Sequence, residues 1–288
     1  MDHFLVRTPD HLGDGVMALP AILAIARVGA IHLVGPQWVR RLYAGTRINS
    51  TTAPDTAILF KPSFSAAWKV RHMSRRVGHS GQWRTWLLSD ALPQREGHRA
   101  EQYAALAAAV NATVTGLPSF TTTPDEQREA KRLVSDQHVL LLPLSNSQHT
   151  VGWKGFRALA DAIGPRAVFA AGPGECEQLR SIAGPHKTLP ALDIGVFGAV
   201  AQRATHVVGN DSGLAHLSAA ARHAIGCNPA TVHVIFGSTS PDRTGPIGCT
   251  AHQTAPLPCQ PCYKKHCAIA ADPPCLNVEM ASLQEAIA

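Results

Sequence analysis

The sequence predicts an α/β protein with two parallel sheets in tandem along a chain of 288 residues. Short apolar strands alternate with helices of about ten to fifteen residues, first in 4–111 and again in 125–237. Such alternation produces parallel sheets with helices on both faces. A stretch rich in Thr, Pro and Gly, residues 113–127, is typical of a connection between domains. We therefore expect two Rossmann-like domains, 1–122 and 123–288.

The first predicted domain opens with a strand-helix-strand unit. In residues 4–35, FLVR is an apolar strand, LGDG is a turn, and the run that follows has apolar residues at helical spacing before a second strand. Further strands are expected at 57–60 and 75–78, and a helix is expected at 99–111.

The second predicted domain repeats this alternation. Ligands bind beyond the carboxyl ends of the strands in such sheets, so the polar loops after the strands are the candidate binding elements. We expect strands at 138–145, 167–172, 206–210 and 231–237, and helices at 125–135, 154–164, 173–184 and 193–204.

Composition limits the class of protein. Charged residues make up 16% of the chain, below the usual value of about 25%, and hydrophobic residues make up 45%, which predicts a globular protein. The long apolar stretch Val16–Gly35 contains Pro20, Arg27, Gly29 and His32, whereas a membrane span needs about 20 uninterrupted apolar residues. The N-terminus has no basic region followed by an apolar run. We expect no transmembrane segment and no signal peptide, hence a cytoplasmic protein.

The net charge of +6 originates in one segment. Residues 61–99 hold eight basic and two acidic side chains, which is the whole excess. Trp68, Trp83 and Trp86 lie among these charges. Such a surface fits a nucleic acid, an anionic membrane surface or a phosphorylated sugar, and it equally fits a basic face that meets only solvent.

The segment THVVGNDSGLAHLSAAA, residues 205–221, is a strand that ends in a polar turn and continues as a helix of small residues. Asp211 or Ser212 would cap this helix, and Gly213 permits the tight turn. The N–H groups at a helix N-terminus also bind anions, and His216 lies close behind them. The segment therefore predicts either a plain helix cap or a phosphate site.

Two further loops at the same sheet edge favour an anion site. Lys154 is expected in the first turn of its helix, where the helix dipole disfavours a cation unless a negative group offsets it. With Ser147 and Thr150 before it, Lys154 suggests a second anion clamp, the alternative being a surface pair with a carboxylate. Glu175 follows a strand-end glycine, where related folds place a carboxylate against ribose, although the dipole alone also favours a glutamate there.

Asp14 lies in the LGDG turn after the first strand of the other domain. If the two domains face one another, its carboxylate points into the cleft opposite GNDSG and can take a proton from an incoming hydroxyl. The alternative is that Asp14 caps the following helix.

Four of the seven cysteines are concentrated near the C-terminus in the pattern C-x2-C-x4-C-x7-C. Four thiols at this density suit a structural, tetrahedral zinc or iron site. Reduced thiols are the alternative, and a disulfide knot is least expected in a reducing cytoplasm. The candidate ligands are Cys259, Cys262, Cys267 and Cys275.

Together these motifs resemble glycosyltransferase family 9, the ADP-heptose:lipopolysaccharide heptosyltransferases. The resemblance rests on HLGDGVMALPAIL, WKGF, GNDSGLAH and FGSTSPDRTGP, and on the CL pair at Cys275 and Leu276. In WKGF, Phe156 stands where the family has Trp. The combination of LGD and GNDSG in one chain is the specific signal.

The resemblance implies a GT-B fold of two facing Rossmann-like domains, with the acceptor bound by 1–122 and the nucleotide sugar by 123–288. It implies an inverting transfer of a heptose from ADP-heptose to a sugar hydroxyl of the lipopolysaccharide inner core. No cofactor is needed for catalysis, because a helix dipole and a lysine supply the positive field. The alternatives are a protein heptosyltransferase of the autotransporter type and a non-catalytic nucleotide-sugar or glycolipid binder.

The resemblance also assigns residues and partners. Asp14 is the general base, Lys154 and the backbone at Ser212 hold the diphosphate, and Glu175 contacts the ribose. The expected acceptor is an anionic glycolipid at the cytoplasmic membrane face, with a protein acceptor second and no nucleic acid. The protein is then cytoplasmic or peripheral to the inner membrane. The implied donor site comprises Lys154, Glu175, Asp211, Ser212, Gly213, His216, Ser147 and Thr150.

Overall fold

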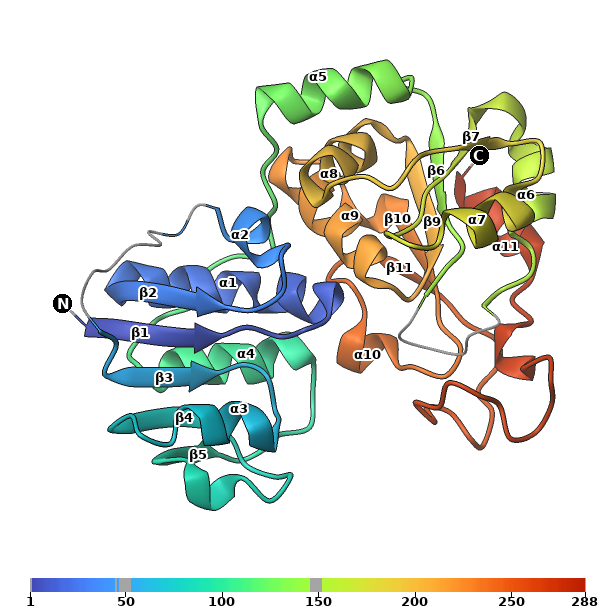
Figure 1. Ribbon diagram of the computed structural model, residues 1–288. Coiled ribbons are helices and arrows are strands. Elements are labelled where there is room, and N and C mark those ends of the chain that lie inside the picture. Colours follow the sequence, from blue (N-terminus) through green and yellow to red (C-terminus); the bar gives the residue numbers. More distant parts are fainter. Residues whose placement is uncertain (1, 45, 47–52, 146–151, 288) are drawn as a thin grey trace. The chain divides into compact units, whose positions relative to one another are not determined.

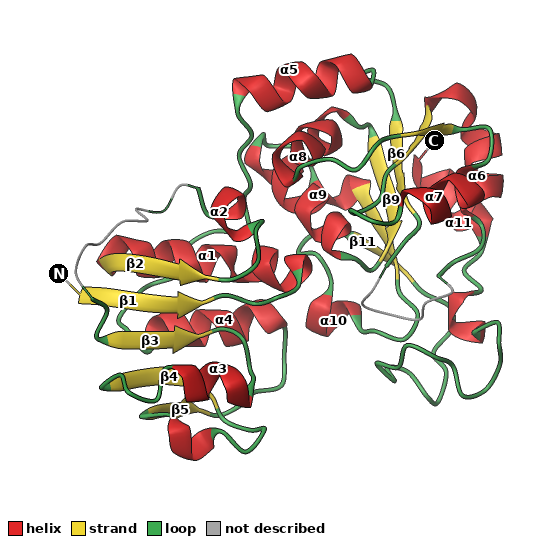
Figure 2. Cartoon of the chain, in the orientation of Figure 1, coloured by secondary structure: helices red, strands yellow, loops and turns green. Residues whose placement is uncertain are grey.

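The computed structural model describes residues 2–44, 46, 53–145 and 152–287. The chain divides into two compact units, Met1–Pro118 (unit 1) and Ser119–Ala288 (unit 2), and each contains one sheet in which all paired strands are parallel (Figures 1 and 2). The predicted α/β class with two parallel sheets is confirmed. The boundary expected from the sequence, 122/123, lies four residues beyond this division.

Unit 1 has the strand order β2-β1-β3-β4-β5. Helices α1 and α4 pack side by side on one face of this sheet (Figure 2). The strands are β1 (Asp2–Arg7), β2 (Gly29–Val34), β3 (Thr56–Leu59), β4 (Arg75–His79) and β5 (Asp90–Leu92), and the helices are α1 (Leu12–Val28), α2 (Val39–Leu42), α3 (Phe64–Lys69), the 3-10 helix η1 (Thr85–Leu87) and α4 (Arg99–Ala108).

The first turn of α1 is held in place by close packing. A Cβ atom on Gly15 would lie 2.5 Å from the Trp38 ring, so only glycine fits here. The buried Tyr43 hydroxyl donates a hydrogen bond of 2.8 Å to the Gly15 carbonyl. The backbone of the LGDG segment at the start of α1 is therefore closely packed.

Unit 2 has the strand order β11-β10-β9-β6-β7-β8. Its strands are β6 (Val139–Leu142), β7 (Ala167–Phe169), β8 (Lys187–Thr188), β9 (His206–Asn210), β10 (Val232–Ile235) and β11 (Thr250–His252). Its helices are α5 (Pro124–Leu133), α6 (Phe156–Ile163), α7 (Cys176–Ala183), α8 (Ile194–Arg203), α9 (Gly213–Ala224), α10 (Pro241–Thr244) and α11 (Met280–Ile287), with 3-10 turns η2 (Gly164–Arg166), η3 (Pro229–Thr231) and η4 (Pro274–Leu276).

The end of the predicted linker belongs to helix α5. Thr123 and Glu126 form a capping box: the Thr123 hydroxyl accepts from the Glu126 N–H at 3.3 Å, and the Glu126 carboxylate accepts from the Thr123 N–H at 2.7 Å. Pro124 then fits the first helical position. The Thr-rich composition that suggested a linker thus partly reflects a helix start.

The two central strands of unit 2 bring two polar loops together. β6 and β9 pair in parallel with Leu142 opposite Gly209, and a Cβ atom on Gly209 would lie only 2.8 Å from the Leu142 side chain. Both strands are almost entirely buried. Because paired parallel strands end at the same edge, the loops after β6 and β9 leave the sheet side by side.

Candidate functional site

The turn between β9 and α9 has Ser212 as its N-cap. The Ser212 hydroxyl accepts a hydrogen bond of 3.3 Å from the Ala215 N–H, so Ser212, and not Asp211, supplies the cap. Gly213 is the first residue of α9. Asp211 and His216 are both buried, with 3.9 Å between the Asp211 Oδ1 and His216 Nε2 atoms. The helix N-terminus therefore combines a cap, a glycine and a buried carboxylate-imidazole pair.

The loop after β6 is bonded directly to this turn. The Ser145 hydroxyl donates to the Asp211 backbone carbonyl. The buried Asn210 amide donates to the Pro143 carbonyl at 2.5 Å and accepts from the Trp153 N–H at 3.3 Å. Asn210 thus connects three segments of the sheet edge. The sequence analysis did not single it out, although a polar residue at the end of an apolar strand is a usable signal.

Lys154 does not occupy the first turn of α6. The helix starts at Phe156 with Gly155 as its N-cap, and the Trp153 indole lies against Gly155, where a Cβ atom would approach the ring to 2.1 Å. The Lys154 ammonium pairs with Asp272 at 2.8 Å, and both side chains are largely exposed. Such a pair contributes about 1 kcal/mol or less. The dipole argument for Lys154 was therefore wrong.

Phe156 lies in the hydrophobic core of unit 2 and is not exposed at the site. It is fully buried and packs edge-on against Trp153, with 5.1 Å between the ring centroids. The Trp153 indole N–H donates to the Val278 carbonyl at 3.0 Å. This contact ties the Lys154 loop to the segment that leads into α11. Ser147 and Thr150, the other predicted residues of this loop, lie outside the described residues.

Glu175 is the N-cap of α7 and does not lie in its first turn as expected. Its carboxylate accepts a hydrogen bond of 2.8 Å from the Gly172 N–H. One carboxylate oxygen therefore closes the turn after β7, at the same sheet edge as the Ser212 cap.

Asp14 is the third residue of α1, and the cap position belongs to His11. Its Oδ1 atom accepts a hydrogen bond of 3.0 Å from the Tyr103 hydroxyl and lies 3.5 Å from the Arg99 guanidinium. Burial, together with the Asp14 charge, raises the pKa of Tyr103 well above its usual value, so the phenol keeps its proton and remains a donor. Two residues of α4 thus orient the Asp14 carboxylate, which excludes a simple capping role.

The basic segment 61–99 is not one uniformly charged face. Lys61 pairs with Asp10, and Arg75 pairs with Asp90 at 2.6 Å. Arg84 is completely buried, where its guanidinium donates to backbone carbonyls. Much of the charge counted in the sequence is therefore neutralised or inside the fold.

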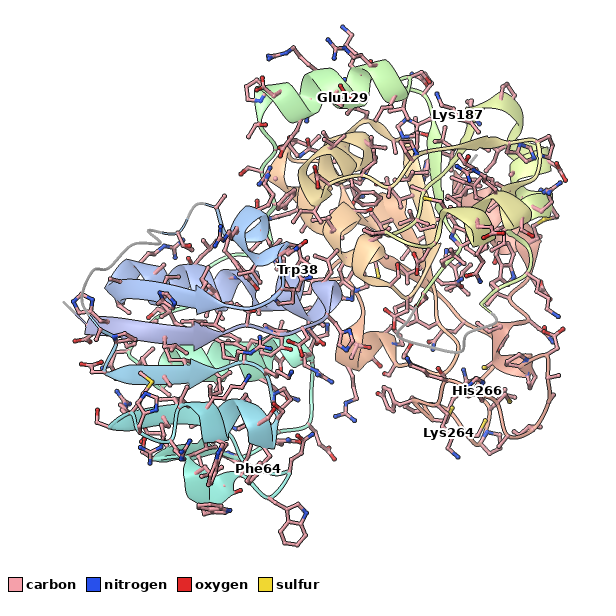
Figure 3. The ribbon with its side chains drawn as sticks, viewed as in Figure 1. Trp38, Phe64, Glu129, Lys187, Lys264 and His266 are labelled. Atoms are coloured by element: carbon pink, nitrogen blue, oxygen red, sulfur yellow. The ribbon has the colours of Figure 1, made fainter. Side chains whose placement is uncertain are left out.

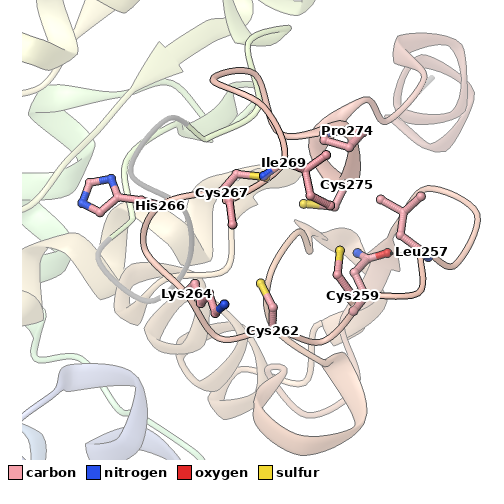
Figure 4. A pocket seen from close by; sticks show the side chains of 11 residues that line it. Leu257, Cys259, Cys262, Lys264, His266, Cys267, Ile269, Pro274 and Cys275 are labelled. Atoms are coloured by element: carbon pink, nitrogen blue, oxygen red, sulfur yellow. Dashed lines mark hydrogen bonds between the residues drawn. The ribbon is translucent and has the colours of Figure 1, made fainter.

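The four C-terminal cysteines line one cavity. Figure 4 shows the side chains of Cys259, Cys262, Cys267 and Cys275 around this space of about 50 Å³. All seven cysteines are free thiols, and burial, with neighbouring thiols, raises the pKa of Cys275 to about 11. Across the described ranges, no group of three or more His, Cys, Asp or Glu side chains is gathered closely enough to hold a metal ion.

Two parallel-sheet units with polar loops at their carboxyl edges define the general class: an α/β protein of Rossmann-like architecture, in which ligands bind beyond the carboxyl ends of the strands. The family is more specific. The family model described as glycosyltransferase family 9 (heptosyltransferase) matches residues 50–271. The chain belongs to this family and is a glycosyltransferase.

Solved structures share the fold of this chain. The chain is similar to the E. coli ADP-heptose lipopolysaccharide heptosyltransferase II, with TM-score 0.74 and 18% identity over 100% of this chain and 98% of that chain. E. coli heptosyltransferase WaaC with ADP gives TM-score 0.62 and 17% identity over 86% and 92%. The iron-containing dodecameric heptosyltransferase TibC, from enterotoxigenic E. coli, gives 0.62 and 14% over 99% and 76%.

These similarities confirm the predicted GT-B fold class. No curated protein matches the sequence. Within the described part of the chain, no helix has both the length and the apolar character needed to span a membrane.

Proposed function

We propose that this glycosyltransferase transfers a heptose, with inversion, from ADP-heptose to a sugar hydroxyl of the lipopolysaccharide inner core. The observation that carries the proposal is the Asp14 carboxylate in the first turn of α1, which Tyr103 and Arg99 hold in place. A carboxylate in that position has no capping task, and a positioned carboxylate is suited to general base catalysis.

In this mechanism the Asp14 carboxylate takes the proton of the acceptor hydroxyl. The hydroxyl oxygen forms a bond to the anomeric carbon of the donor, while the bond from that carbon to the diphosphate breaks and ADP leaves. Attack opposite the leaving group inverts the anomeric centre. Tyr103 and Arg99 bind one carboxylate oxygen, which orients the other for the proton transfer.

The donor is proposed to bind at the carboxyl edge of the unit 2 sheet. Backbone N–H groups of the α9 N-terminus, beside Ser212 and Gly213, would bind the diphosphate. Lys154 would exchange its exposed partner Asp272 for a phosphate, at little cost because such surface pairs are weak. The Glu175 carboxylate, which is held at this edge by the Gly172 N–H, would bind the ribose, and the Asp211–His216 pair would shape the pocket.

The proposal is tested by ADP release from ADP-heptose in the presence of a deacylated inner-core acceptor. The Asp14→Asn variant should bind ADP with the affinity of the wild type and turn over at least about 100-fold more slowly, because the amide cannot take the proton. Turnover equal to the wild type would remove Asp14 as the base. Transfer to an autotransporter protein, with none to the core sugar, would support the protein heptosyltransferase instead.

We also propose that Cys259, Cys262, Cys267 and Cys275 hold a structural zinc or iron ion. Four thiolates are a complete ligand set for either metal. Because the thiols line one cavity without being closely gathered, ligation would draw the loop together and order it.

Elemental analysis of the purified full chain should find about one metal ion per chain. The Cys259→Ser/Cys262→Ser variant should lose it, since two ligands cannot hold a structural site. Cys249→Ser, outside the set, is the matched control and should retain the metal. A wild-type chain that carries no zinc or iron would overturn this site.

A further inference from the structure

Three exposed aromatic side chains of unit 1 lie close together and a fourth lies in the adjoining loop, and the proposed chemistry uses none of them. Phe64 and Trp68 of α3 stack with 6.0 Å between ring centroids, and Trp86 of η1 lies 6.4 Å from Phe64. Trp83 lies in the loop that precedes η1, and 91% of its surface is exposed. Figure 3 shows Phe64 at the periphery of unit 1. Phe64, Trp68, Trp83 and Trp86 are called the aromatic patch below.

The loop that carries Trp83 is rigidly built although it is strained. Gln82 and Trp83 have φ values of 51° and 56°, a left-handed conformation that is uncommon for non-glycine residues. The buried Arg84 guanidinium donates to the carbonyls of Lys61 and His79, and Thr85 accepts from the Gly81 N–H at 3.2 Å. The surroundings thus enforce a conformation that presents an indole to solvent, and such enforced strain concentrates at functional sites.

Positive charge borders the aromatic patch. Lys69 and Arg71 are exposed, and the Arg71 guanidinium lies 4.3 Å from the centroid of the Trp68 ring. In residues 61–99 only Asp90 and Glu96 are acidic, and Asp90 is paired with Arg75. The surface therefore combines indole rings with exposed cations.

We propose that the aromatic patch, with Lys69 and Arg71, docks this enzyme onto the surface of an anionic lipid bilayer. Indoles favour the membrane-water interface, where the ring is apolar and the N–H remains hydrated. Basic side chains near an anionic surface add electrostatic attraction to this apolar contribution. The inference rests on the proposed function, because a lipid-linked acceptor lies at such a surface.

Two observations favour lipid over other partners. Phe64 and Arg71 already cover faces of the Trp68 ring, so this ring is not open to the base stacking by which single-stranded nucleic acids bind. An exposed lysine beside the rings is unlike the core of a protein interface, from which lysine is depleted.

The test is sedimentation of the full chain with vesicles of phosphatidylcholine alone or with about 30% phosphatidylglycerol, without donor or acceptor. The wild type should bind the anionic vesicles, and the Trp83→Ala/Trp86→Ala variant should bind them at least about fivefold more weakly. Lys69→Gln/Arg71→Gln should reduce binding to anionic vesicles and abolish its salt dependence. Ile225→Ala, which removes an exposed apolar side chain from unit 2, is the matched control and should bind like the wild type.

Because the substituted side chains are exposed, each variant should unfold at the temperature of the wild type. Thermal unfolding measures this and verifies that each variant is folded. Equal vesicle binding by the tryptophan variant and the wild type would overturn the proposal, as would wild-type binding to oligonucleotides but not to vesicles. Because the vesicles contain no acceptor, failure of docking is distinguishable from failure of the proposed transfer, which is measured with a soluble acceptor.

Discussion

Asp14 and Tyr103 are 89 residues apart in sequence and share a hydrogen bond of 3.0 Å. The contact exists because α1 and α4 pack together on the sheet of unit 1. The tyrosine touches no substrate in the proposed mechanism; it acts through Asp14 and is a positioning residue. Tyr103 therefore contributes to catalysis by orienting the Asp14 carboxylate.

The Tyr103→Phe variant should lower kcat about tenfold and leave the dissociation constant for ADP unchanged, because it frees the Asp14 carboxylate to rotate. Steady-state kinetics and calorimetry measure the two quantities.

Tyr43→Phe is the matched control. It also removes a buried hydroxyl, but one that donates to the Gly15 carbonyl. Both variants should lose about 1 kcal/mol of unfolding free energy. If the two substitutions lowered kcat equally, Tyr103 would have only a structural role.

At the scale of elements, three adjacent strands of unit 2 are joined by a ladder of imidazoles. The rings of His206 on β9 and His233 on β10 share a hydrogen bond of 3.1 Å, and those of His233 and His252 on β11 share one of 3.2 Å. Burial, with the neighbouring His252, His206 and Arg222, lowers the pKa of His233 to about 4. The ladder is therefore neutral at pH 7.

We expect unit 2 to lose stability as the pH falls from about 6.5 towards 4. In this window the unfolded chain protonates His233 while the folded chain does not, so acid favours unfolding, by about 2 to 3 kcal/mol at the lower limit. Above pH 6.5 the contribution is fully present. Urea denaturation at pH 7.5 and 4.5 measures the difference.

The His233→Gln variant separates the ladder from other acid-sensitive groups. It should be less stable at pH 7.5 and should lose less stability between the two pH values than the wild type. If the variant and the wild type lost the same amount of stability between the two pH values, His233 would not contribute to the pH dependence.

At the scale of the whole molecule, each of the two compact units has a hydrophobic core of its own. Unit 2 has its own core around β6, β7 and β9, which α11 completes with Leu283 and Ile287. Unit 1 has a core of its own beneath α3. A unit with its own core can fold independently.

Residues 119–288 expressed alone should bind ADP with a dissociation constant within about threefold of the full chain, because all proposed donor residues lie in this unit. Residues 1–118 alone should bind no ADP. Calorimetry with each fragment measures this, and circular dichroism verifies that it is folded. ADP binding by a folded unit 1 would reverse the proposed assignment of donor and acceptor domains.

By itself the sequence determined the fold class and the edge of each sheet at which the chemistry lies. The alternation of strands and helices predicts parallel sheets, and their geometry gathers the loops after β6, β7 and β9 at one edge. Local patterns also located the α9 turn, although Asp211 and Ser212 were equal candidates for its cap. This much is predictable because hydrophobic period and turn chemistry are local properties.

Only the tertiary structure decided which partner each polar side chain has. The Asp14 carboxylate accepts a hydrogen bond from Tyr103, and Lys154 pairs with Asp272. Arg84, which the sequence places among the surface charges, is buried. The tertiary structure also shows that α6 starts two residues after Lys154, so the helix dipole does not act on this side chain as predicted. These partners are far apart in the chain, and packing brings them together through contacts that no local spacing encodes.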